Sequence, residues 1–172
     1  MATQTGLNRR PLDLVLVAFF ILSIVYGFVW SLPEGLGVPV SADSPWPPLR
    51  GLYDWSVAQE PAHLHPPTSL LANGLYDGFI QSPLLLFVVY GLLRRRLWVR
   101  PLSLVYAGAG IANMLIYFAV TFLGPDVPPN PAVYLPFNLP WLIAPAVLLV
   151  RMWNPDPFGA VQERIQVPQP AE

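Results

Sequence analysis

Asp77 is the residue whose type and position point most directly to chemistry. It lies inside an apolar stretch, residues 68–93, that is long enough to cross a bilayer, for which roughly 20 residues suffice. A carboxyl group near the middle of a membrane is costly, so such groups almost always face a cavity or a polar partner. We therefore expect Asp77 to face a ligand cavity. The alternative is a protonated or hydrogen-bonded aspartate that holds the helices together.

The neighbours of Asp77 follow the spacing of an α-helix. Asn73, Asp77 and Gln81 are four residues apart and share one face of such a helix. A second stripe, of small residues that let another helix approach closely, lies beside it: Gly74, Gly78 and Ser82. The stretch therefore predicts a spanning helix with a polar face toward the protein interior and a small-residue face against a neighbouring helix.

Glu60 is a second acid of interest, because it lies just before this stretch in the sequence Gln-Glu-Pro. Two carboxyl groups can move a proton across a ligand, one as acid and one as base, if burial raises a pKa toward neutrality. If the chain is an enzyme, Asp77 and Glu60 are its predicted catalytic residues; otherwise Glu60 is an ordinary loop acid. His63 and His65 lack a third ligand, and we expect neither a metal nor a cofactor.

Polar and aromatic side chains recur at helical spacing in three other apolar stretches. They are Ser23, Gly27 and Trp30; Asn113 and Tyr117; and Tyr134, Asn138 and Trp141. Four helices with such faces can enclose a small apolar ligand, and the ring of Trp141 could stabilise a cation. The predicted ligand-binding residues are Glu60, Asp77, Gln81, Asn113, Tyr117, Asn138 and Trp141. Hydrogen bonding between helices without a cavity is the alternative.

Four apolar stretches must position these side chains, at residues 14–30, 68–93, 101–123 and 132–150. Of the 172 residues, 54% are hydrophobic and only 11% are charged, whereas soluble domains carry about a quarter charged residues. We therefore predict an integral membrane protein, an all-α four-helix bundle. A net charge of −1 gives no basic surface for nucleic acid, and the absence of cysteine excludes disulfides and thiolate chemistry.

The segments outside the spans also have a predicted organisation. Residues 1–13 form a short cytoplasmic arm, residues 14–153 the membrane domain, and residues 154–172 a cytoplasmic tail that we expect to be disordered. The connection 32–67 is rich in proline, glycine and aromatic residues, and we expect it to cover the bundle as an outward lid, with part of residues 49–58 helical. Prolines interrupt the second and fourth spans: Pro83, Pro136, Pro140 and Pro145.

The arginines predict the orientation of the bundle. In a four-span arrangement one side carries Arg9, Arg10, Arg94, Arg95, Arg96, Arg100, Arg151 and Arg164. The other side carries only Arg50, together with Glu34, Asp43, Asp54, Glu60 and Asp126. The positive-inside rule therefore places both termini in the cytoplasm.

The order of these segments resembles a known superfamily. The run QEPAHLHPPTSLLANGLYDGFIQSPLLLFVVYGLL, followed by WVRPLSLVY and VYLPF, is similar to the sigma-two receptor branch of the EXPERA superfamily. The segment NLPWLIAP is similar to the Asn-x-x-Trp segment of emopamil-binding protein, the sterol Δ8–Δ7 isomerase branch. The resemblance covers roughly residues 12–153 and points to a bacterial member of the superfamily.

The resemblance implies a four-helix membrane domain whose central cavity takes sterols and amphiphilic amines. By position, Glu60 and Asp77 match two cavity acids of the receptor branch, and Asn138 and Trp141 match the polar and cation-stabilising pair of the isomerase branch. The first span has neither the isomerase's His-x-x-x-Glu pair nor the receptor's acid. What it offers instead is Ser23, Tyr26 and Trp30. A lysine-rich retrieval tail is also missing; we expect the plasma membrane for a bacterial protein and the ER for a eukaryotic one.

The function that we predict is binding of a sterol-like or isoprenoid lipid, or of an amphiphilic amine, whose polar or cationic end is held by Asp77 and Glu60. The alternative is an enzyme that shifts a double bond: one carboxyl group donates a proton, the other carboxylate removes one, and Trp141 shelters the carbocation. A third class is a scaffold or transport subunit without a ligand. The sequence is also compatible with a homodimer. The missing first-span histidine favours binding, whereas Asn138 and Trp141 favour isomerisation.

Overall fold

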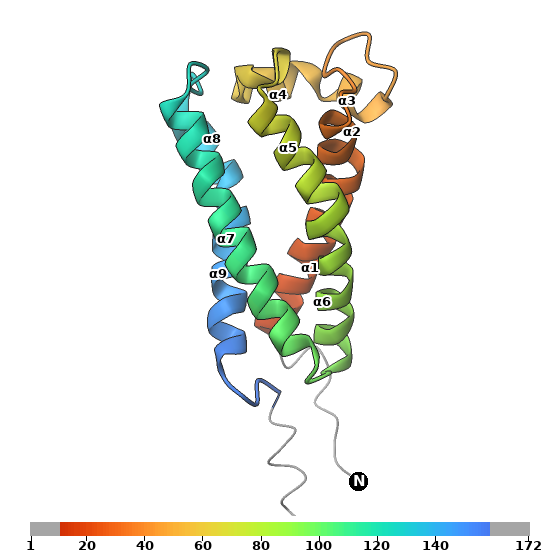
Figure 1. Ribbon diagram of the computed structural model, residues 1–172, viewed down its shortest axis with the longest axis vertical. Helices are drawn as coiled ribbons and strands as arrows, with labels where there is room; N and C mark the ends of the chain where they lie inside the picture. The colour runs from red at the N-terminus through yellow and green to blue at the C-terminus, as the bar shows by residue number, and fades with distance from the viewer. Residues whose placement is uncertain (1–10, 159–172) are drawn as a thin grey trace, which may run out of the picture.

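Four long helical segments form the framework of the protein (Figure 1). The computed structural model describes residues 11–158. Four segments are long and apolar enough to span a membrane: Pro11–Gly35, Thr68–Arg94, Val99–Leu123 and Pro131–Trp153. No strand occurs among residues 11–158, so the predicted all-α bundle with four spans is confirmed.

The first span is longer than predicted, because a proline is accommodated within it. It consists of α1 (Pro11–Tyr26), a π-helical turn η2 (Gly27–Ser31) and α2 (Leu32–Gly35). In a regular helix the ring of Pro33 would collide with the carbonyl of Val29, four residues earlier. A wider turn, closed by a hydrogen bond from Leu32 N–H to Gly27 O, avoids the collision. The carbonyl of Val29 instead accepts a hydrogen bond of 2.7 Å from the indole Nε1 of Trp46.

The second span repeats this arrangement. It consists of α5 (Thr68–Tyr76), a π-helical turn η4 (Asp77–Gln81) and α6 (Ser82–Arg94). Pro83 follows η4 as Pro33 follows η2, and Ser82 N–H donates to Asp77 O across the widened turn. The interruption predicted at Pro83 therefore takes the form of one wide turn, which begins at Asp77 and ends at Gln81.

The small-residue stripe of the second span packs against the first span, as predicted. A Cβ atom added to Gly74 would lie 2.3 Å from the carbonyl oxygen of Ser31, and one added to Gly78 would lie 2.5 Å from Leu32 Cβ. Real Cβ atoms do not approach other atoms so closely, so glycine is required at this crossing. The crossing also brings the turns η2 and η4 into contact.

The third and fourth spans pack along each other. The third is one unbroken helix, α7 (Val99–Leu123), whereas the fourth consists of α8 (Pro131–Asn138) and α9 (Pro140–Trp153). The predicted interruption at Pro140 is the junction between α8 and α9. Pro145, by contrast, is buried inside α9 and lies against Gly110 of α7, where an added Cβ would be 3.4 Å from the proline ring.

The spans converge at one end of the molecule and diverge at the other (Figure 1). The main apolar core fills the converging half, and its fully buried members include Phe20, Leu85, Leu92, Leu148 and Met152. At this end Arg151 Nε donates to Asp13 Oδ1 at 3.1 Å, which joins the last span to the first. The polar side chains that line the central hollow lie in the diverging half.

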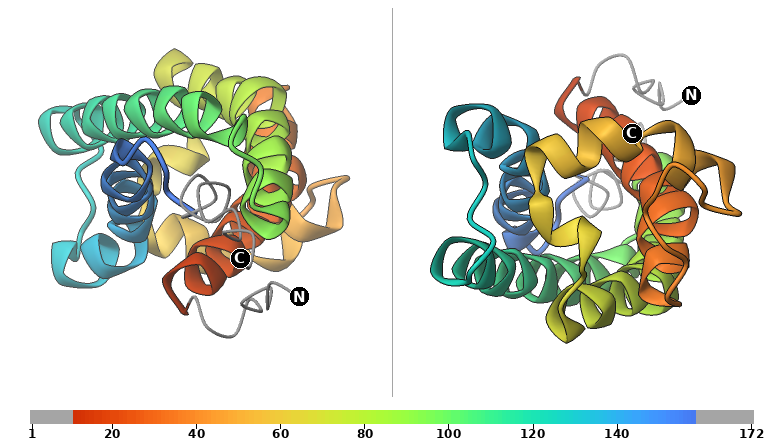
Figure 2. Two further views of the ribbon diagram at one scale, coloured as in Figure 1. Left: turned by 90° about the horizontal axis from the view of Figure 1, so that it is seen from below. Right: turned by 90° about the horizontal axis from the view of Figure 1, so that it is seen from above.

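The connection between the first two spans lies across the diverging end as a lid (Figures 1 and 2). It contains α3 (Pro47–Gly51), α4 (Tyr53–Gln59) and a 3-10 turn, η3 (Pro61–Leu64), so the helix predicted within residues 49–58 is confirmed. The ring of Trp55 packs edge-on against Phe137 of α8, with centroids 4.6 Å apart. The lid is therefore attached to the fourth span through Trp55 and to the first through Trp46.

Parts of the predicted arm and tail lie outside the described residues. These parts are residues 1–10, with Arg9 and Arg10, and residues 159–172, with Arg164. Residues 154–158 of the predicted tail are described, and Phe158 is buried against the apolar core.

Candidate functional site

Asp77 and Gln81 line a central hollow that all four spans enclose. Its other walls include Tyr26, Ser31, Asn73, Asn113, Tyr117, Asn138 and Trp141. Six of the seven predicted ligand-binding residues, all except Glu60, therefore lie around one hollow; their role in binding remains a prediction. The volume of the hollow is about 50 Å³, which is room for only a few water molecules.

Two side-chain oxygens in the central hollow lack hydrogen-bond donors. Asp77 Oδ1 and Gln81 Oε1 are buried and have no hydrogen-bond partner within the described part of the chain, although the Ser31 hydroxyl hydrogen-bonds to the Asp77 carboxyl group. The side-chain nitrogen of Asn138 is occupied, because it donates to Tyr134 O within its own helix at 3.0 Å. A buried acceptor that is left unpaired costs about 1–3 kcal/mol, so the hollow favours an occupant that donates hydrogen bonds.

A second, larger hollow lies between α5 and α7 beneath the lid, and we call it the side hollow. Its volume is about 460 Å³, within the range of about 300–1,000 Å³ typical of small-molecule sites. Its lining includes Glu60, Tyr76, Ile116, Val120, Thr121 and Asp126. It shares Leu70, Asn73, Asn113 and Tyr117 with the central hollow.

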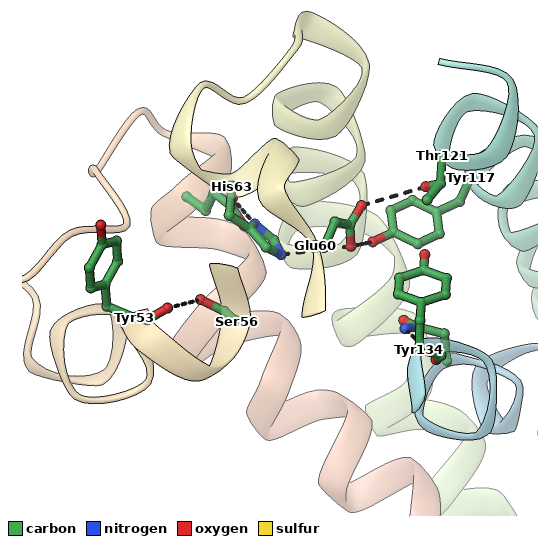
Figure 3. A network of polar contacts seen from close by, with 9 residues as sticks. Tyr53, Ser56, Glu60, His63, Tyr117, Thr121 and Tyr134 are labelled. Atoms are coloured by element: carbon green, nitrogen blue, oxygen red, sulfur yellow. Dashed lines mark hydrogen bonds and ion pairs between the residues drawn. The ribbon is translucent and has the colours of Figure 1, made fainter. Parts of the chain in front are cut away.

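The two acids predicted to act as a pair line different hollows. Asp77 lines the central hollow and Glu60 the side hollow, whereas the sequence predicted one cavity lined by both. The difference arises because Tyr117 lines both hollows and its hydroxyl donates a hydrogen bond to Glu60 Oε2 (Figure 3). Thr121 Oγ1 also donates to Glu60, at 3.5 Å. Because Glu60 belongs to the lid, these bonds hold the lid against α7.

His63 connects Glu60 to an acid that sequence reasoning did not assign to the site. Its Nδ1 lies 2.5 Å from Glu34 Oε1, and its Nε2 lies 3.8 Å from Glu60 Oε2. Glu34 and His63 are 4% and 8% exposed and line the central hollow. His65, the other histidine considered as a metal ligand, is exposed.

The predicted bounds of the first span, residues 14–30, left out an acid that lines the site. The span continues through Pro33 to Gly35 and so brings Glu34 into the site. A signal was available, because Gly27, Trp30 and Glu34 follow helical spacing. The proline before Glu34 suggested the end of a helix, whereas the structure accommodates it with a π-helical turn.

Burial and neighbouring charges change the proton affinities of the lid residues. Burial raises the pKa of Glu60, although the charge of His63 and the hydrogen bond from Tyr117 oppose this. Burial alone lowers the pKa of His63, but the hydrogen bond and charge of Glu34, with the charge of Glu60, outweigh it and raise that pKa. Among residues 11–158 no arginine forms a salt bridge with Glu34, Glu60 or Asp77. The site is therefore acidic, with His63 as its basic partner.

Four apolar spans around a polar, acidic interior define a multi-pass membrane protein with functional groups inside its membrane domain. The model of the EBP family, described as EXPERA (EXPanded EBP superfamily), matches residues 48–152, more than half of the chain. The chain belongs to this family, which confirms the predicted membership of the EXPERA superfamily. The matched range contains Glu60, Asp77, Asn138 and Trp141. No curated protein and no solved structure matches the chain.

Proposed function

We propose that the protein binds a sterol-like or isoprenoid lipid, or an amphiphilic amine, within its membrane domain. The observation that carries this proposal is the pair of unpartnered oxygens, Asp77 Oδ1 and Gln81 Oε1, in a hollow enclosed by the spans. A hydroxyl or an ammonium group would supply the missing donors. An ammonium would also form an ion pair with Asp77, which the low dielectric of the site strengthens.

The surroundings of Asp77 favour a neutral or cationic head over an anionic one. Glu34 lines the same hollow, and a phosphate or carboxylate there would face two acids. Trp141 and Tyr26 lie on another wall, with ring centroids 5.6 Å apart, and aromatic rings attract cations. Amines and alcohols are therefore the expected heads, and acidic lipids are not.

Shifting a double bond is a second candidate function, favoured by the contacts among Glu34, His63 and Glu60. Such a chain of titratable groups can hold and move a proton beside the ligand. One of the predicted catalytic residues, Asp77 or Glu60, would protonate a carbon of the double bond. The other carboxylate would remove a proton from the far side of the resulting cation, which Trp141 would shelter. The double bond changes its position, and because one proton is added and one is removed, the atomic composition of the lipid is unchanged.

Lipid analysis of an aspartate variant tests the proposal. Wild type, Asp77→Asn and Asp54→Asn are purified in nanodiscs, their bound lipids are identified by mass spectrometry, and dodecylamine binding is measured by calorimetry. Asp54 is an exposed lid acid that lines neither hollow, which makes it a matched control. We expect Asp77→Asn to weaken dodecylamine binding at least about tenfold, and a neutral sterol much less, because only the charge is removed.

Two results would contradict the proposal. If the wild type carries only bulk phospholipid and binds no amine, the protein is a scaffold or transport subunit. If Asp77→Asn and Asp54→Asn have equal effects on amine affinity, Asp77 is a structural residue that holds the helices together.

A further inference from the structure

The central and side hollows differ in size and in lining. The central hollow, at about 50 Å³, has room for a small polar group beside Asp77 and Gln81 but not for the body of a lipid. The side hollow, at about 460 Å³, is large enough for an apolar body. The buried acid of the side hollow, Glu60, already accepts hydrogen bonds from Tyr117 and Thr121. The unpartnered oxygens are therefore in one hollow and most of the space is in the other.

The lining of the side hollow includes apolar side chains that α7 exposes. Ile116 and Val120 line this hollow, yet they are 64% and 42% exposed on a spanning helix. We expect apolar side chains that are exposed on a spanning helix to face acyl chains. An apolar ligand that enters from the membrane between α5 and α7 would then reach the side hollow without crossing water.

The boundary between the hollows is mostly polar, and Leu70 is the apolar side chain that both hollows share. Asn73 of α5 and Asn113 and Tyr117 of α7 line both hollows. Tyr117 is fixed at this boundary because Glu60 of the lid accepts its hydroxyl hydrogen bond (Figure 3). A ligand that reaches from one hollow to the other passes these residues, which can hydrogen-bond its head on the way.

We propose, on the basis of the proposed function, that a single amphiphile occupies both hollows. Its head, an ammonium or hydroxyl group, donates to Asp77 and Gln81 in the central hollow. Its apolar body lies in the side hollow between α5 and α7, and Tyr117 contacts the point where head and body meet. The head must donate hydrogen bonds within a small hollow that Glu34 and Asp77 line. This favours a primary amine or an alcohol over a trimethylammonium head, which has no N–H to donate, and over a phosphate head, which is anionic.

A photoreactive ligand tests this arrangement. The probe is a twelve-carbon primary amine with a diazirine at its apolar end, added to the full-length protein in nanodiscs, and crosslinked residues are identified by mass spectrometry. We expect crosslinks on the side-hollow faces of α5 and α7, near Ile116 and Val120, and their loss in Asp77→Asn. The N,N,N-trimethyl counterpart of the same probe should not label these positions.

A pair of neighbouring substitutions provides the matched control. Ile116→Trp fills the side hollow, whereas Leu115→Trp, at a position that is 55% exposed on the same helix, lines neither hollow. We expect Ile116→Trp to reduce crosslinking at least about tenfold and Leu115→Trp to leave it unchanged. Val120→Trp provides a second filled variant if Ile116→Trp does not fold.

The possible outcomes separate this inference from the proposed function. If dodecylamine binding depends on Asp77 but the crosslinks lie on α1, α6 or α9, or both tryptophan variants behave alike, the two-hollow arrangement is wrong and the proposed function stands. Equal labelling by the trimethyl probe would overturn the restriction on the head. If no probe labels the protein saturably and no lipid co-purifies, the proposed function itself fails.

Discussion

His63 lies between two carboxylates, and this position makes the docking of the lid sensitive to pH. Both Glu60 and His63 have raised pKa values, so each binds its proton more tightly in the folded protein. Stability from such a group is fully present below its ordinary pKa and is lost as the pH rises through the raised one. The ordinary pKa values are 4.5 for Glu60 and 6.5 for His63. Deprotonation of either group as the pH increases therefore weakens the attachment of the lid.

We predict that the free energy of lid opening decreases as the pH rises above 6.5. The decrease should be on the order of 1 kcal/mol, because deprotonation of His63 turns its charge-assisted hydrogen bond to Glu34 into an ordinary hydrogen bond from a neutral imidazole. The groups that face His63 are Glu34 of α2, Glu60 of the lid and the Trp30 ring, which lies nearly perpendicular to the imidazole. Hydrogen exchange of η3, corrected for the intrinsic rate at each pH, measures this opening.

The second histidine of the lid is the control for this experiment. His63→Gln should flatten the pH dependence above 6.5, whereas His65→Gln should preserve it, because His65 is exposed. A flat profile in the wild type, or equal effects of the two substitutions, would show that the contact of His63 with Glu34 does not control the lid.

The site residues that could be predicted from the sequence are those that recur at helical spacing within a span. The four-residue spacing identified Asp77 and Gln81, and helical spacing in two further spans identified Asn113, Tyr117 and Trp141, all of which line the central hollow. The contact between His63 and Glu34 was not predictable, because it forms only when the lid folds back over the first span. No local spacing relates two residues that are 29 positions apart.

At the scale of helices, the crossing of the first two spans depends on backbone contact at Gly74. We predict that Gly74→Ala destabilises the protein by about 1–3 kcal/mol, because the new methyl group would lie 2.3 Å from the carbonyl oxygen of Ser31 and backbone atoms cannot move aside. Gly108→Ala is the control, because nothing lies within 4 Å of its added Cβ. That substitution should be neutral or stabilise α7 by about 0.5–1 kcal/mol.

Thermal unfolding in detergent, followed by circular dichroism, measures both effects. Equal melting temperatures for Gly74→Ala and Gly108→Ala would mean that the first two spans can separate without cost, and that the small-residue stripe does not determine their crossing.

The helices themselves were predictable from apolar length, but their irregular turns were not. Hydrophobicity located all four spans, and small-residue spacing identified the face that joins the second to the first. Pro33 can either end the helix or be accommodated by one wide turn. The wide turn requires another hydrogen-bond donor for the carbonyl of Val29, because proline has no N–H to supply. That donor is Trp46, a residue of the folded lid, and local sequence contains no information about it.

At the scale of the whole molecule, one end of the bundle is a packed apolar core and the other contains the site. The converging end contains the apolar core and the contact of Arg151 with Asp13. The diverging end contains the two hollows, and the lid lies across this end (Figure 1). The lid also contributes Glu60 and His63, so the segment that covers the site supplies part of its chemistry.

Among residues 11–158 every arginine except Arg50 of α3 lies at the converging end, and this distribution predicts the orientation of the protein in its membrane. Arg95 and Arg96 lie in the turn between α6 and α7, Arg94 ends α6 and Arg100 lies in the first turn of α7; Arg151 lies near the end of α9. The lid at the opposite end carries Asp54 and Glu60. Arginines near the ends of spans are retained on the cytoplasmic side, so the turn should be cytoplasmic and the lid should face outward.

Single-cysteine variants test this orientation, since the chain has no cysteine of its own. Arg96 and Asp54 are both exposed and lie at opposite ends, which makes Arg96→Cys and Asp54→Cys a matched pair. In intact cells an impermeant maleimide should label Asp54→Cys alone, and both variants should react after the membrane is permeabilised. Labelling of Arg96→Cys in intact cells would reverse the orientation. The lid would then face the cytoplasm, and the proton supply to His63 and Glu60 would follow the internal pH.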